Sequence, residues 1–241
     1  MKHKLHKFET NEIRETFEGS NSYEKPYVSL VKEDNTVHYN IGHPYIDLGL
    51  PSGTLWARMN VGAENETDYG LYFAWGEIVG YSSLTQTKQF VWGDYQLCDG
   101  GNKESSMTKY NSTDGLVALE LTDDAVRVAW GGEWRMPTKE QFKELTANTT
   151  SEWITNYNNS GVNGRLFTSQ NGNYLFFPAC GRLYWNSTEG VGVNGYYSTI
   201  DLSTESATYY NYLNFRNNVM SIGNNANRCC GQPVRGVIVK Q

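Results

Sequence analysis

The sequence predicts an α+β domain dominated by loops, with two short helices and small antiparallel sheets. Three observations predict it. Only two stretches carry both start and stop signals of a helix. The remaining apolar runs are short, extended and separated by Gly and Asn, as strands and turns are. Aromatic residues make up 14% of the 241 residues, which suits a loop-rich domain that needs bulky anchors in its core.

Net charge and composition exclude several classes of function. Six net negative charges offer no basic field for a phosphate backbone, so we expect no nucleic-acid partner. No segment has the length and apolar character to insert in a membrane. Four cysteines are too few for a disulfide framework, and their spacing matches no zinc or redox motif. We therefore expect neither a structural metal nor a cofactor.

Composition divides the chain into a charged arm, residues 1–40, and a body rich in Gly, Trp, Tyr and Asn, residues 41–241. In the arm, Pro26–Val31 and Val37–Asn40 favour a β-hairpin around the turn Lys32–Asn35. A lone hairpin is marginally stable in water, so it should pack on the body or on a second copy in a homo-oligomer. The alternative is a flexible arm.

Two helices are predicted in the body. The first runs from Thr122 to Trp130, with acidic residues at its start and Gly131 at its end. The second begins at Thr138, whose hydroxyl caps the helix while Gln141 reaches back, and it places an apolar stripe on one side.

Short strands are predicted at Tyr174–Phe177, Tyr209–Phe215 and Val234–Val239. Four tryptophans beside glycines are expected in the core, namely Trp56, Trp75, Trp130 and Trp134. Arg135 lies between two apolar residues and needs an acidic partner, which the sequence does not identify.

Several motifs in one order resemble the Fibrobacter succinogenes major paralogous domain. They are Tyr45–Trp56, Tyr69–Glu77, Trp130–Thr138, Phe176–Gly181 and a closing segment from Asn194–Tyr197 to Arg228–Arg235. The resemblance covers about residues 44 to 240. It implies a C-type lectin-like fold, of the branch shared with formylglycine-generating enzymes and with the variable proteins of diversity-generating retroelements.

The segment from Asn194 to Gly231 has an unusual composition. Asn, Tyr, Ser and Thr account for 20 of its 38 residues, and only four are charged. Recognition surfaces are rich in these residue types because Tyr supplies rigid contact area while Asn and Ser form hydrogen bonds. Catalysis would require titratable groups with tuned pKa values, which are scarce here. The segment therefore favours a binding surface over an active site.

Alternation within Tyr209–Phe215 puts Tyr210, Tyr212 and Asn214 on one face, where both rings are expected to meet solvent. A turn at residues 216–218, a return strand Val219–Ile222 and an Asn-rich loop at residues 223–228 should follow. The candidate ligand-binding residues are Asp201, Glu205, Tyr210, Tyr212, Asn214, Arg216, Ile222, Asn224, Asn225, Asn227, Cys229 and Cys230.

The resemblance also offers an explanation for this composition. In variable proteins of diversity-generating retroelements, adenine-directed mutagenesis changes Asn codons into codons for Tyr, Ser, Thr, Asp, Ile and Cys. The segment looks like such output, including the pair Cys229 and Cys230, where related segments more often have Tyr or Asn. The plainer interpretation is an Asn- and Tyr-rich surface on an ordinary paralogous domain.

Two enzyme-like or metal-dependent alternatives fit less well. Formylglycine-generating enzymes use a pair of cysteines that bind copper, but neighbours on a strand, as Cys229 and Cys230 would be, point to opposite faces. Calcium-dependent lectins place calcium ligands around a proline, and Gln232-Pro-Val234 lacks the third ligand.

We therefore expect a non-catalytic, calcium-independent, receptor-binding or adhesin-like protein that binds a protein or glycan on a cell surface. The alternatives are a structural surface or tail-assembly component and, third, a formylglycine-generating-enzyme-like oxidase. Met1 to Phe17 contain no signal-peptide run, which fits an extracellular phage-particle component or a bacterial surface protein that lacks its leader.

Overall fold

The computed structural model describes residues 4–7, 13–16, 37–83 and 87–239. Near the N-terminus, β1 (Lys4–Lys7) pairs antiparallel with β2 (Ile13–Thr16). The predicted strand at residues 26–31 and its turn lie outside the described residues.

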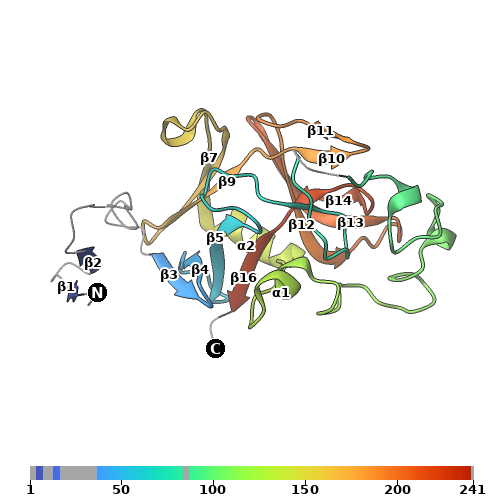
Figure 1. Ribbon diagram of the computed structural model, residues 1–241, viewed down its shortest axis with the longest axis horizontal. Coiled ribbons are helices and arrows are strands. Elements are labelled where there is room, and N and C mark those ends of the chain that lie inside the picture. The colour runs from blue at the N-terminus through green and yellow to red at the C-terminus, as the bar shows by residue number, and fades with distance from the viewer. Residues whose placement is uncertain (1–3, 8–12, 17–36, 84–86, 240–241) are drawn as a thin grey trace.

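A four-stranded antiparallel sheet joins distant parts of the chain in the order β16-β5-β4-β3 (Figure 1). It comprises β3 (Val37–Asn40), β4 (His43–Ile46), β5 (Thr54–Asn60) and β16 (Arg235–Val239). β3 is the predicted strand, and it pairs with β4 across the turn at Ile41 and Gly42. The last four residues of the proposed arm thus belong to a sheet of the body.

Both predicted helices are present, although the first begins at Ala125 and not at Thr122, because Asp124 is its N-cap. α1 (Ala125–Trp130) is capped by Asp124, whose Oδ1 accepts hydrogen bonds from two backbone N–H groups, and Gly131 ends it with φ 71°. α2 (Lys139–Asn148) begins with the capping box of Thr138 and Gln141. Asp124 is also the acidic partner of Arg135, at 2.7 Å from its Nε.

The remaining elements are short and antiparallel, so the α+β, loop-rich fold class is confirmed. β7 (Thr149–Ile154), β8 (Gly164–Ser169) and β9 (Tyr174–Pro178) form one three-stranded sheet. β12 (Gly195–Leu202), β13 (Tyr209–Arg216) and β14 (Val219–Asn227) form another. Two-stranded pairs are β10 (Arg182–Tyr184) with β11 (Ser187–Glu189) and β6 (Tyr72–Phe73) with β15 (Gln232–Pro233). Single 3-10 turns lie at Trp92–Asp94, Glu104–Ser106 and Tyr157–Asn159.

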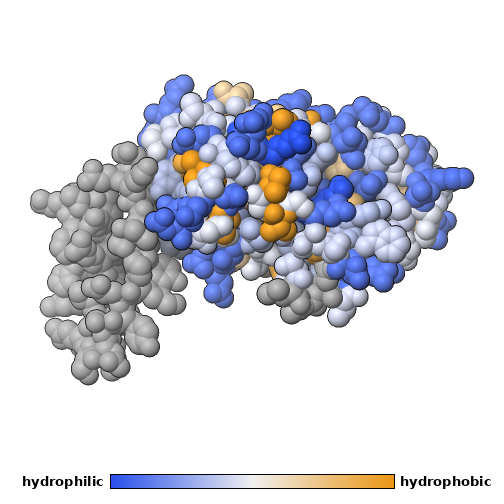
Figure 2. Space-filling model, turned by 90° about the horizontal axis from the view of Figure 1, so that it is seen from above, coloured by the Kyte–Doolittle hydropathy of each residue, from blue (hydrophilic) through white to orange (hydrophobic). Residues whose placement is uncertain are grey.

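Aromatic side chains hold the elements together. Trp56, Trp75 and Trp134 are fully buried as predicted, whereas Trp130 is only half-buried. The Trp56 ring lies 5.1 Å from the Phe142 ring, which joins β5 to α2. Figure 2 shows that, on the face seen from above, apolar residues form small patches among hydrophilic ones. Among the described residues, none of the helices is long and apolar enough to cross a bilayer.

Two fully buried arginines fix the C-terminal segment to the rest of the body. Arg228 donates hydrogen bonds to the Tyr95 hydroxyl and to the carbonyls of Lys109, Tyr110 and Ala207. Arg235 donates to Asn60 Oδ1 and to three carbonyls, and burial lowers its pKa. Through these hydrogen bonds, the segment that follows β14 is fixed to parts of the chain that are distant in sequence.

Candidate ligand-binding face

The strand register of the β12-β13-β14 sheet separates two faces. Tyr197, Leu213 and Ile222 lie opposite one another and pack on the core. Two other rows of cross-strand neighbours point the other way. We call that side the outer face and define it by Tyr196, Tyr212, Asn214, Ser221 and Asn225.

Two tyrosine rings form the centre of the outer face. The Tyr196 and Tyr212 centroids are 6.2 Å apart with an interplanar angle of 36°. Gly223 leaves room for the Tyr212 ring, since a Cβ built there would lie 2.5 Å from Tyr212 Cε1. The Tyr212 hydroxyl donates to Asn225 Oδ1 at 3.2 Å. The ring is therefore held in one orientation.

The short hairpin β10–β11 adds a charged pair beside these rings. Arg182 lies over Tyr196, with its guanidinium carbon 5.5 Å from the ring centroid, and over Tyr184 at 5.8 Å. Its Nε and Nη2 donate to Glu189 Oε2 at 3.0 and 2.9 Å. Burial would lower the Arg182 pKa, but the hydrogen bond with Glu189 and the nearby Cys230, Glu189 and Tyr196 together raise it above its usual value. Arg182 thus remains positively charged at neutral pH.

The chemistry of the outer face is hydrogen bonding and stacking. Burial raises the pKa of Tyr212, so its phenol remains neutral and both donates and accepts. Asn214, Ser221 and Asn225 add uncharged donors and acceptors. No side chain among these is prepared for proton transfer near neutral pH, which is what general acid–base catalysis requires.

The prediction that Tyr210 presents its ring to solvent is wrong. Tyr210 is 0% exposed, and its ring stacks on Trp75 with centroids 5.7 Å apart. Tyr210 does share the outward direction with Tyr212, as alternation predicted, but Trp75 covers that end of the strand. The Trp75 indole is held there by a 2.8 Å hydrogen bond to the Thr199 carbonyl.

The prediction that Cys229 and Cys230 contact a ligand is also wrong. Both are buried, at 0% and 1% exposure, in the hydrophobic core. They lie in a turn after β14, where the two thiols interact with each other. This interaction raises the pKa of Cys229 and lowers that of Cys230.

Two further candidates have structural roles. Asp201 Oδ2 accepts a hydrogen bond from the Lys139 backbone N–H at 2.5 Å, at the first residue of α2. Burial raises the pKa of this carboxyl. Ile222 lies on the inner face and packs on the core. The structure therefore gives no reason to place either residue in a binding site.

The predicted loop at residues 223–228 is instead the second half of β14, which runs to Asn227. An irregular register between the pairs Tyr212–Gly223 and Tyr210–Ala226 lets Asn224 turn aside, where its Nδ2 donates to Glu205 Oε1 at 2.6 Å. Asn227 pairs with Tyr209 at the far end of the sheet. Glu205 and Asn224 are therefore engaged with each other, and Asn227 lies opposite Tyr209, whose side chain points away from that of Tyr212.

Of the predicted residues, Tyr212, Asn214 and Asn225 come together, and Arg216 is exposed at the end of β13. Sequence reasoning missed Tyr196, Ser221 and Arg182. Alternation along β12 and β14 would have indicated the first two once strand pairing was known. Nothing in the sequence near Arg182 indicates that its hairpin lies beside Tyr196.

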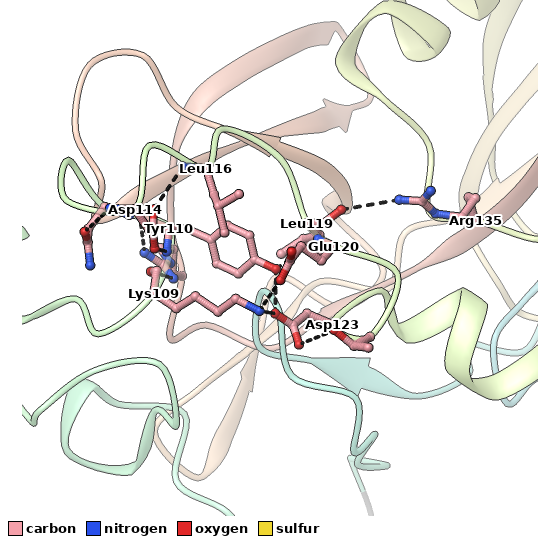
Figure 3. Close-up of polar contacts among 11 residues, drawn as sticks. Lys109, Tyr110, Asp114, Leu116, Leu119, Glu120, Asp123 and Arg135 are labelled. Atoms are coloured by element: carbon pink, nitrogen blue, oxygen red, sulfur yellow. Dashed lines mark hydrogen bonds and ion pairs between the residues drawn. The ribbon is translucent and has the colours of Figure 1, made fainter.

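A dense polar cluster lies elsewhere, around Lys109 (Figure 3). Lys109 Nζ contacts Asp123 Oδ2 and Glu120 Oε2, each at 2.6 Å, and the Tyr110 hydroxyl donates to Asp123. Burial raises the pKa of Tyr110 to about 12. Burial alone would raise the Asp123 pKa, but hydrogen bonds from Lys109 and Tyr110 lower it. Both pKa values move away from neutral pH, so near pH 7 Tyr110 remains neutral and Asp123 remains ionised.

Among the described residues, no three His, Cys, Asp or Glu side chains gather as a metal site requires. Gln232, beside Pro233, is 1% exposed and lies in β15. Its amide therefore faces the interior and not a surface where calcium could join a sugar.

No model of a known protein family, no curated protein and no solved structure matches this chain. A role for the outer face must therefore be argued from the geometry and chemistry of its own residues.

Proposed function

We propose that this protein is a non-catalytic binding protein that attaches to a protein or glycan on a cell surface through its outer face. The observation that carries the proposal is the pair of half-buried rings, Tyr196 and Tyr212, which lie among uncharged hydrogen-bonding side chains with the paired Arg182 on one side. Such a surface gives large contact area with few charges to desolvate.

Preorganisation strengthens the proposal. The Tyr212 hydroxyl bonds to Asn225, and its ring lies directly over Gly223, which has no side chain. The neighbouring Tyr210 ring lies 6.4 Å away. A side chain already fixed in place loses little conformational entropy when a ligand binds. The covered Tyr210 thus acts as support for the ring that makes the contact.

We further propose the C-type lectin-like fold and an extracellular role, with oligomerisation through residues 1–40. The motif resemblance supports the fold, and it is compatible with the burial of Trp56, Trp75 and Trp134. In a multivalent particle, weak outer-face contacts would add up to strong attachment.

The most specific version of this proposal is that a diversity-generating retroelement varies the residues of the outer face. Surveying codons 194–231 in many isolates would test it. We expect substitutions at outer-face codons such as 212, 214 and 225 and none at the buried codons 210, 229 and 230. Equal variation at buried and outer codons, or none at either, would return the chain to an ordinary paralogous domain.

The binding function is tested with labelled full-length protein on an array of purified glycans and cell-surface proteins. For each bound ligand, we expect Tyr212→Ala to weaken affinity about tenfold or more, as truncation of a central aromatic contact does. The matched control is Tyr39→Ala, because Tyr39 is an exposed tyrosine on β3, in a different sheet.

Two results would contradict the proposal. Equal affinity of Tyr212→Ala and the wild type for every array ligand would remove the outer face from recognition. Absence of any array ligand, together with an oligomer that dissociates in Tyr212→Ala, would make the outer face an assembly surface and favour the structural alternative.

A further inference from the structure

A groove of about 420 Å³ lies at the turn end of the β13–β14 hairpin. One wall is Trp153 of β7, the second is the loop at Gly192 and Val193, and the third is the hairpin turn. Its lining residues are Trp153, Gly192, Val193, Arg216, Asn217, Asn218 and Val219. We call it the turn groove.

Buried and half-buried side chains hold the walls of the turn groove in place. Arg165 Nη2 donates to the carbonyls of Arg216 and Asn217 at 2.8 and 2.9 Å. On the opposite wall, Asn163 Nδ2 donates to the Gly192 carbonyl at 3.0 Å. The Trp153 ring packs edge-on against Phe215, with centroids 6.5 Å apart. The backbone around the groove is therefore held in place, whereas the exposed side chains of Arg216, Asn217 and Asn218 would be ordered by a ligand.

The polar groups inside the groove are free to bind. Within the described part of the chain, the side chains of Arg216, Asn217 and Asn218 make no hydrogen bond or ion pair with protein. Arg216 is the charged residue of the lining, so the groove is locally positive on a chain with six net negative charges. A neutral or cationic ligand would leave this guanidinium unpaired.

The apolar lining defines the other half of the chemistry. The Trp153 ring is half-buried, while Val193 and Val219 are 58% and 40% exposed. A flat indole beside two side-chain amides suits a sugar ring, since its C–H face stacks on the aromatic while its hydroxyls donate and accept.

We propose that the turn groove binds a carboxylate-bearing sugar at the end of a glycan. Arg216 pairs with the carboxylate, Trp153 stacks on the sugar ring, and the amides of Asn217 and Asn218 bind hydroxyl groups. This inference rests on the proposed function, because it names a chemical class of glycan for a protein that attaches to cell surfaces.

The test measures binding of N-acetylneuraminic acid and glucuronic acid to the full-length protein by titration calorimetry and ligand-observed NMR. Glucose and N-acetylglucosamine are the uncharged probes, and a short peptide with a free carboxyl terminus is the non-sugar carboxylate. We expect the acidic sugars to bind at least about tenfold more tightly than the two neutral sugars, which lack the charge-assisted pair, and than the peptide, which lacks the sugar ring that stacks on Trp153.

Arg216→Gln should weaken acidic-sugar binding about tenfold, because a neutral amide replaces the guanidinium. Arg127→Gln is the matched control, since Arg127 lies on α1, outside both the outer face and the turn groove. Trp153→Leu should also weaken the acidic sugars, and equal melting temperatures would show that it folds.

Failure to bind either acidic sugar, equal binding of neutral sugars, preference for the peptide, or indifference to Arg216→Gln would each overturn the inference. Tyr212→Ala separates this result from the proposed function. Array binding that needs Tyr212, without acidic-sugar binding, would remove only the turn groove. Acidic-sugar binding that needs Arg216, without Tyr212-dependent array binding, would remove only the outer face.

Discussion

Tyr210 and Tyr212 lie two residues apart on the same strand and point in the same direction, yet their environments are opposite. Tyr210 is buried under Trp75, and its hydroxyl lies 3.2 Å from Ser198 Oγ. Tyr212 lies on the outer face, half-exposed above Gly223. Sequence alternation determines direction, whereas a distant residue determines exposure. One tyrosine thus stabilises the fold and its neighbour is available to a ligand.

Arg228 and Arg216 form a second contrast in the same segment. Arg228 is fully buried, with four hydrogen bonds and the Trp75 ring 4.8 Å from its guanidinium carbon. Arg216 is exposed in the turn groove. Arg228 therefore stabilises the core, whereas Arg216 is available to a ligand. In the tyrosine pair and in the arginine pair alike, we expect one variant to lose stability and the other to lose binding.

The largest effect is expected from Arg228→Ala. It leaves a buried hydroxyl and three carbonyls without a donor, each costing about 1–3 kcal/mol, so the free energy of unfolding should fall by more than about 4 kcal/mol. Urea denaturation measures it, with Arg216→Ala as the control, expected within about 0.5 kcal/mol of the wild type. Similar values for the two variants would contradict this assignment.

Tyr210→Ala should be nearly as damaging. Removing a buried ring costs about 3–5 kcal/mol, whereas Tyr212→Ala should cost less than about 1 kcal/mol because its ring is partly solvated. Tyr210→Phe retains the ring and should lose only about 1 kcal/mol, from the contact with Ser198. The comparison fails if Tyr212→Ala unfolds at the same urea concentration as Tyr210→Ala.

Gly223→Ala should have a smaller effect, because the new methyl group would collide with the Tyr212 ring. Overpacking of this kind costs about 1–3 kcal/mol, and displacement of the ring should also weaken ligand binding. Gly93→Ala is the control, since no atom lies within 4 Å of a Cβ built there. Unchanged stability and binding in Gly223→Ala would show that the ring is not held as described.

The smallest effect concerns pH and the Lys109 cluster. The folded-state pKa of Asp123 is lowered, so ionised Asp123 stabilises the fold above its unfolded pKa of about 4, and this contribution is lost as the pH falls through the folded value. Asp123→Asn should lower the melting temperature at pH 7 and flatten its decline between pH 5 and pH 2. An equally steep decline in the variant would assign acid sensitivity to other groups.

Much of the fold could be predicted because its signals are local. The capping box of Thr138 and Gln141 and the stop at Gly131 each depend on residues within one or two turns. The direction of Tyr212 and Asn214 followed from alternation in the same way. Local chemistry therefore located both helices and half of the outer face.

The missing half depended on contacts between distant segments. Trp75 covers Tyr210 from 135 positions away, and Arg182 reaches Tyr196 only because two hairpins pack side by side. Cys229 and Cys230 were misplaced because the strand was expected to give way to a surface loop, whereas β14 continues to Asn227 and the turn after it enters the core. Burial of these residues is a property of the tertiary fold.

Binding through the outer face is tested most directly with the double variant Tyr196→Ala/Tyr212→Ala. Its melting temperature and its dissociation constant for a ligand found on the array would be compared with those of the wild type and Tyr39→Ala. We predict a melting temperature close to that of the wild type, with binding lost in the double variant and unchanged in Tyr39→Ala. Wild-type affinity in the double variant would contradict recognition through this face.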